Sequence, residues 1–266
     1  GGYHTILPRL LNSLSLSLIA VLVYELGKAC SLSRSASLRA AYLTGAFPLL
    51  AFFAATVVRD IVITLLLVFI AYLTVRFMYI QGRGRLLVII AIIAGSLVVI
   101  WNFRKESAFV GLIAIAITLV RTANGTNKAK KWRLVVSILL LSIVVLSLWG
   151  VLISAIDPLG RIAYFAEDRS SLASAKGLSQ FVWNAPAPLS YILRFGYGLL
   201  SPLPIGTTNP LSLYQGVGTI IWIFLMPFAF LQVPASIRDP RRFILLSFWM
   251  MFFIGTTQTA FVPRQF

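Results

Sequence analysis

Long apolar stretches separated by short polar connections run along most of this chain. Several of them approach the roughly 20 residues that an α-helix needs to cross the hydrocarbon core of a bilayer. A backbone inside lipid must satisfy its own hydrogen bonds, so such stretches are expected to be helices. The pattern predicts about eight membrane segments, at residues 10–27, 40–58, 60–80, 86–103, 106–120, 133–153, 217–234 and 242–257.

The predicted fold class is therefore all-α, a polytopic membrane protein. Residues 1–154 form six N-terminal segments, residues 155–216 form one long loop, and residues 217–266 add two further segments. Aromatic side chains lie among small and polar ones in the loop, which predicts short helices in the membrane interface. Because the chain begins at Gly1 without methionine, we expect it to be part of a longer protein.

Composition agrees with this interpretation and narrows the function classes. Of the 266 residues, 59% are hydrophobic and 11% are charged, against roughly 25% charged in a soluble domain. The net charge of +16 does not indicate nucleic-acid binding, because the basic residues lie between apolar stretches rather than on one face or tail. The single Cys30 excludes an internal disulfide, and the single His4 cannot build a zinc site alone. Cofactors are not identified by the sequence, and a divalent cation remains open.

Alternate loops differ in charge, and this difference predicts the orientation. One set of loops holds most of the basic residues. The opposite set, apart from the long loop, holds only Arg9, Arg59, Arg104, Lys105 and Arg264. The positive-inside rule places the first set in the cytoplasm. The loop 155–216 and both ends of the chain are then predicted to be non-cytoplasmic.

The outward charges need their own explanation, because the orientation rule does not account for them. Basic residues at an outer membrane boundary suit an anionic ligand such as a lipid phosphate. Asp60, at the outer start of the third segment, is the candidate catalytic carboxylate. The candidate lipid-phosphate contacts are Arg59, Arg104, Lys105, Arg194 and Arg264. The alternative is ordinary electrostatics, with a carboxylate at a helix N-terminus and arginines extended to the headgroups.

Seven different short motifs follow one another along the chain, at Pro8–Ser13, Val23–Gly27, Ala46–Pro48, Arg59–Asp60, Arg104–Lys105, Leu200–Pro204 and Val262–Arg264. Their order resembles the multi-spanning GT-C glycosyltransferases, in particular the bacterial family-39-like branch. The resemblance implies transfer of sugars from polyprenyl-phosphate donors at the outer face of the cytoplasmic membrane, in envelope glycan assembly. It also implies that Asp60 is the second acidic site, since the family's principal carboxylate would precede Gly1.

Three function classes stay open at this point. Integral-membrane O-antigen and exopolysaccharide polymerases are close competitors of the glycosyltransferase hypothesis, since they also handle a lipid (pyro)phosphate-linked sugar outside the membrane. A transporter or flippase would place its site near the bilayer midplane. A non-catalytic subunit would pack within a larger assembly through its small residues. The expected partners are membrane lipids and a polyprenyl-phosphate-linked sugar, with other membrane subunits left open.

Overall fold

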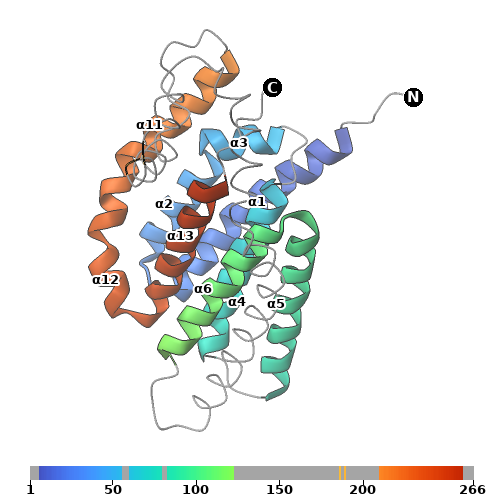
Figure 1. Ribbon diagram of the computed structural model, residues 1–266, viewed down its shortest axis with the longest axis vertical. Helices are drawn as coiled ribbons and strands as arrows, with labels where there is room; N and C mark the ends of the chain where they lie inside the picture. Colours follow the sequence, from blue (N-terminus) through green and yellow to red (C-terminus); the bar gives the residue numbers. More distant parts are fainter. Residues whose placement is uncertain are drawn as a thin grey trace.

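The computed structural model describes residues 6–55, 60–79, 83–122 and 210–259, together with Pro186 and Leu189. In these ranges all regular secondary structure is helical, which confirms the all-α fold class (Figure 1). The helices are α1 Ile6–Ala29, α2 Arg34–Gly45, α3 Pro48–Ala55, α4 Asp60–Tyr79, α5 Arg83–Phe103, α6 Lys105–Thr122, α11 Pro210–Leu231, α12 Val233–Arg238 and α13 Pro240–Thr259.

Three of the described helices are long and apolar enough to cross a membrane: α1, α4 and residues 84–103 of α5. Shorter apolar stretches lie in α6, at Ser107–Leu119, and in α11, at Gly216–Leu231. The described part of the chain is thus helical with three candidate membrane-spanning helices, whereas the total of about eight spans stays a prediction. The predicted segment 133–153 and most of the loop 155–216 lie outside the described residues.

The predicted single segment 40–58 is wrong in one respect, because the helix is interrupted inside it. The α2 helix begins after Ser33, whose hydroxyl accepts the Ala36 N–H at 3.2 Å, and it ends at Gly45. A new helix, α3, then starts at Pro48. Proline has no N–H to donate and disfavours helical geometry in the residue before it. The break at 46–47 is the expected consequence of Pro48.

The α4 helix is the most enclosed of the candidate spans and contacts α1, α5, α6 and α13. The main core cluster joins Ile70 of α4, Ile100 of α5 and Ile115 of α6, all of them almost fully buried. The outer faces of α1 and α11 instead expose large apolar side chains, among them Leu14 and Phe228. Exposed apolar faces around a packed interior are the arrangement that lipid solvation favours.

A buried polar contact fixes α13 against α6, although the two are far apart in sequence. The hydroxyls of Thr118 and Ser247 lie 2.9 Å apart, and both side chains are buried. The Ser247 hydroxyl also donates to the Ile244 carbonyl at 2.9 Å. Hydroxyl contacts of this kind contribute to helix association inside a membrane. The contact places α13 beside α6 and α4 in the bundle (Figure 1).

The bundle has two chemically different ends. One end carries the start of α4 at Asp60 and the α5–α6 turn at Arg104. We call the other the basic end, because the end of α1 and the start of α13 place Lys28 and Arg241 there, near Arg76 of α4. Since α4 has 20 residues, its two ends lie about 30 Å apart at 1.5 Å per residue.

Candidate functional site

Two of the sequence-predicted site residues meet at the end of the bundle opposite the basic end. Arg104 Nη1 lies 3.4 Å from Asp60 Oδ1, although the residues are 44 positions apart. The relative solvent exposure of the side chain is 36% for Arg104 and 32% for Asp60, so the pair is partly open to solvent. The structure thus joins two charged clusters that the sequence presented separately.

Local structure explains why each residue lies where it does. Asp60 is the first residue of α4, where a negative charge is favoured by the helix dipole. Arg104 is the single non-helical residue between α5 and α6, and its N–H still donates to the Ile100 carbonyl at 2.7 Å. Trp101 and Phe109 make an edge-to-face contact across this turn, with ring centroids 5.0 Å apart. The turn is therefore tight, and α5 and α6 are held together beside it.

The Asp60–Arg104 pair is weak as a stabilising element and suitable as a binding element. Exposed ion pairs of this kind contribute about 0–1 kcal/mol. A guanidinium has five N–H donors, and the contact with Asp60 is a single long one. The carboxylate orients the guanidinium at the bundle end, while the remaining donors can meet an anion such as a phosphate.

The other sequence-predicted site residues are not placed by the described part of the chain. Arg59, Arg194 and Arg264 lie outside the described residues, as does the side chain of Lys105. In the ranges that are described, no group of three or more His, Cys, Asp or Glu side chains could hold a metal ion.

The basic end holds a second charged site that the sequence analysis missed. A pocket of about 400 Å³ there is lined by residues of α1, α4 and α13. Its polar lining residues are Glu25, Lys28, Arg76, Tyr79 and Arg241. We call it the basic-end pocket. The positive-inside rule explains each of these cations as an ordinary loop charge. The sequence alone therefore does not indicate that three helices bring them together.

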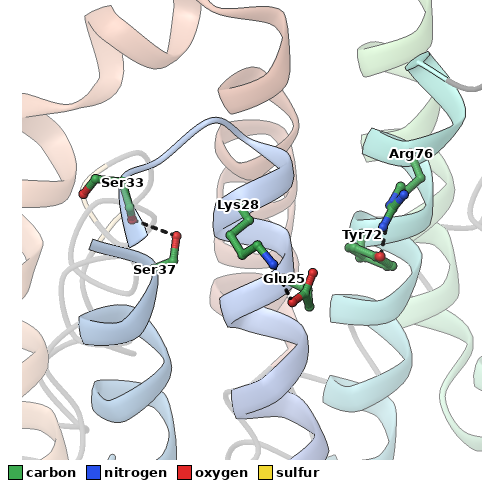
Figure 2. A network of polar contacts seen from close by, with 6 residues as sticks. All are labelled: Glu25, Lys28, Ser33, Ser37, Tyr72 and Arg76. Carbon is green, nitrogen blue, oxygen red and sulfur yellow. Dashed lines mark hydrogen bonds and ion pairs between the residues drawn. The ribbon is translucent and has the colours of Figure 1, made fainter. Parts of the chain in front are cut away.

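Side-chain contacts order the part of this pocket formed by α1 and α4. Figure 2 shows Glu25 on the side of α1 that faces Tyr72 and Arg76 of α4. Lys28 Nζ donates to Glu25 Oε1 at 3.0 Å, a pair spaced by one helical turn. Arg76 Nε donates to the Tyr72 hydroxyl, also at 3.0 Å. One cation of the pocket thus has a carboxylate partner, whereas Arg76 is oriented by a neutral group.

The α13 side of the pocket is tied to the turn after α1. The Arg241 guanidinium donates to the Ser31 hydroxyl and lies over the Tyr79 ring, 4.3 Å from its centroid. The backbone of Arg241 is held too, since its N–H donates to Asp239 and its carbonyl accepts the Cys30 S–H at 3.3 Å. Contacts of both its side chain and its backbone therefore hold Arg241 in place.

Cys30 is expected to resist alkylation in the folded protein. Its side chain is fully buried, and this burial raises the pKa of the thiol to about 12. At pH 8 the reactive thiolate then amounts to on the order of one part in ten thousand. N-ethylmaleimide should leave the native protein in detergent unmodified while labelling the SDS-unfolded chain fully, as read by intact mass. Equal labelling of both samples would show that the turn after α1 is open.

Searches of protein-family models, curated proteins and solved structures find no match to this chain.

Proposed function

We propose that this protein is a membrane glycosyltransferase that uses a polyprenyl (pyro)phosphate-linked sugar at the outer face of the cytoplasmic membrane. The observation that carries the proposal is the convergence of Asp60 and Arg104 at one end of a membrane helix bundle. A basic group and a carboxylate side by side at a membrane boundary match the two needs of this reaction. One need is a counter-ion for a lipid phosphate, and the other is an acceptor for a hydroxyl proton.

The proposed reaction assigns each residue a step. The acceptor hydroxyl oxygen attacks the anomeric carbon of the sugar, and the bond from that carbon to the phosphate oxygen breaks. The phosphate leaves with the electron pair and remains on the lipid, where Arg104 stabilises its negative charge. Asp60 takes the proton of the attacking hydroxyl as a general base. Arg59, Lys105, Arg194 and Arg264 are proposed as additional phosphate contacts.

The proposed orientation rests on the distribution of charge between the two ends. Lys28, Arg76 and Arg241 gather at one end, whereas the described charges at the other end are Arg9 and the paired Asp60 and Arg104. The positive-inside rule assigns the basic end to the cytoplasm. The Asp60–Arg104 end then faces outward, where lipid-linked sugars of an envelope glycan are consumed.

A second candidate is a non-catalytic membrane subunit, and the ion pair itself supports it. Asp60 and Arg104 neutralise one another at 3.4 Å, and such a pair can serve to join α4 to the α5–α6 turn. In that role the pair needs no ligand. The two candidates differ in whether Arg104 binds a lipid phosphate.

Polyprenyl phosphate binding tests the proposal directly. The purified full chain in detergent should retain polyprenyl phosphate, measured by native mass spectrometry. Arg104→Gln is expected to weaken binding about tenfold, because a charge-assisted hydrogen bond is lost. Arg34→Gln is the matched control, since Arg34 is an exposed arginine at the start of α2, away from this end. Equal affinity of the wild-type protein and Arg104→Gln would favour the subunit role.

A further inference from the structure

The basic-end pocket has an excess of cations over carboxylates. Lys28 is paired with Glu25, but no described carboxylate lies within ion-pair distance of Arg76 or Arg241. Both guanidinium groups are held by neutral partners instead, the Tyr72 hydroxyl for Arg76, and the Ser31 hydroxyl and Tyr79 ring for Arg241. Neutral partners orient a guanidinium without cancelling its charge. The pocket is therefore preorganised for an anion.

We propose that the basic-end pocket binds the phosphate of an anionic phospholipid from the adjacent leaflet. The planar guanidinium group of arginine matches the geometry of a phosphate. Arg76 and Arg241 lie on separate helices and can donate to different oxygens of the same phosphate. The volume of about 400 Å³ lies within the range of ligand sites, which is roughly 300–1,000 Å³. A lipid bound there would bridge α1, α4 and α13 and hold the basic end of the bundle together.

The surroundings favour a lipid over a soluble phosphate. The pocket lies at the ends of α1 and α4, which are both long and apolar enough to cross a membrane. A second pocket of about 470 Å³, lined mostly by apolar side chains such as Leu38 and Tyr42, lies between α1 and α2. Tyr24 lines this apolar pocket, and Lys28 Nζ lies 5.0 Å from the centre of its ring. Lys28 and Tyr24 thus connect a site for a phosphate to a site for an acyl chain.

The membrane leaflet expected at the basic end contains the anionic lipids that the pocket is proposed to bind. The basic end is the end that the positive-inside rule assigns to the cytoplasm, and the cytoplasmic leaflet is rich in anionic lipids. Basic pockets between membrane helices on that side are typical sites for anionic headgroups. This site lies at the opposite end of the bundle from Asp60 and Arg104, so the inference does not rest on the proposed function.

Competition between two lipids tests the proposal. The purified full chain is exchanged into detergent with equal amounts of phosphatidylglycerol, which is anionic, and phosphatidylcholine, which is zwitterionic. Native mass spectrometry then gives the ratio of the two bound lipids. We expect the wild-type protein to prefer phosphatidylglycerol. Arg76→Gln and Arg241→Gln should each lower the ratio about fivefold, the effect of one basic residue near an anionic lipid surface.

Glu25→Gln is the decisive variant, because misfolding cannot mimic its expected effect. It removes the carboxylate of the pocket and releases Lys28, so the preference for phosphatidylglycerol should rise about fivefold. Arg34→Gln is the control for general surface attraction, because Arg34 is an exposed arginine at the same end that does not line the pocket, and it should lower the ratio less than Arg76→Gln or Arg241→Gln. A wild-type ratio near one, or a Glu25→Gln ratio equal to that of the wild type, overturns the proposal. Displacement of phosphatidylglycerol by soluble glycerol 3-phosphate assigns the pocket to a free phosphate ester and overturns the lipid assignment.

Discussion

Gly27→Ala is expected to destabilise the protein by about 1–3 kcal/mol, the usual cost of inserting a methyl group into a packed interface. A Cβ at this position would lie 2.7 Å from Ser37 Oγ and 3.3 Å from Ser37 Cα. Ser37 is fully buried, and its hydroxyl donates to the Ser33 carbonyl at 3.1 Å, so it cannot turn away without losing that bond (Figure 2). The α1 and α2 helices must therefore separate. Thermal unfolding in detergent, followed by loss of the monodisperse peak, measures the effect.

Two other glycines serve as controls for this prediction. Gly45 lies in the same α1–α2 interface, but a Cβ there would meet only Ala20 Cβ at an ordinary 3.7 Å. Gly95 of α5 has no atom within 4 Å of its Cβ position. Gly45→Ala and Gly95→Ala should be neutral or slightly stabilising, because alanine is the better helix former. Adding Ser37→Gly to Gly27→Ala removes the contact with Ser37 Oγ and should recover part of the lost stability, even though a glycine inside α2 is itself unfavourable. A double variant less stable than the sum of the two single variants would contradict the contact argument.

The long apolar helices were predictable because each one is specified by local sequence. Apolar stretches gave α1, α4, α5 and α13 to within a few residues at each end, whereas the interruption before Pro48 and the separate short helix α12 were missed. The missed break has a local cause as well, since proline removes a hydrogen-bond donor. The start of α11 at Pro210, seven positions before the predicted start at 217, follows the preference for proline in the first helical turn.

The sites were harder to predict, because they depend on which helices become neighbours. Asp60 and Arg104 each stood out as charges on the less basic side, but no spacing rule indicates that residues 44 positions apart form a pair. Lys28, Arg76 and Arg241 did not stand out at all, because their side of the membrane is expected to be basic. Only the packing of α1, α4 and α13 distinguishes an anion pocket from three ordinary loop charges.

Asp60→Asn is expected to have the largest effect on activity. Under the proposed function it removes the general base and so lowers transfer about 10²–10⁴-fold. The measurement is the release of polyprenyl phosphate from polyprenyl-phosphate hexose by proteoliposomes of the full chain, with source-cell membranes supplying the acceptor. Stability should change little, because the lost ion pair contributes only about 0–1 kcal/mol. Asp60→Glu keeps a carboxylate and should retain part of the activity.

Asp239→Asn provides the matched control. Asp239 Oδ2 lies 3.4 Å from Arg242 Nε, the same separation as in the Asp60–Arg104 pair, and the two pairs are similarly exposed. Asp239 lies at the basic end, beside Arg241. The Asp239–Arg242 pair is local (i,i+3), whereas the Asp60–Arg104 pair joins two elements, so the thermal stabilities of the two variants are compared as well. A loss of activity confined to Asp60→Asn at matched stability then comes from chemistry at the Asp60–Arg104 end. Equal transfer by both variants would assign the Asp60–Arg104 pair a structural role and favour the non-catalytic subunit.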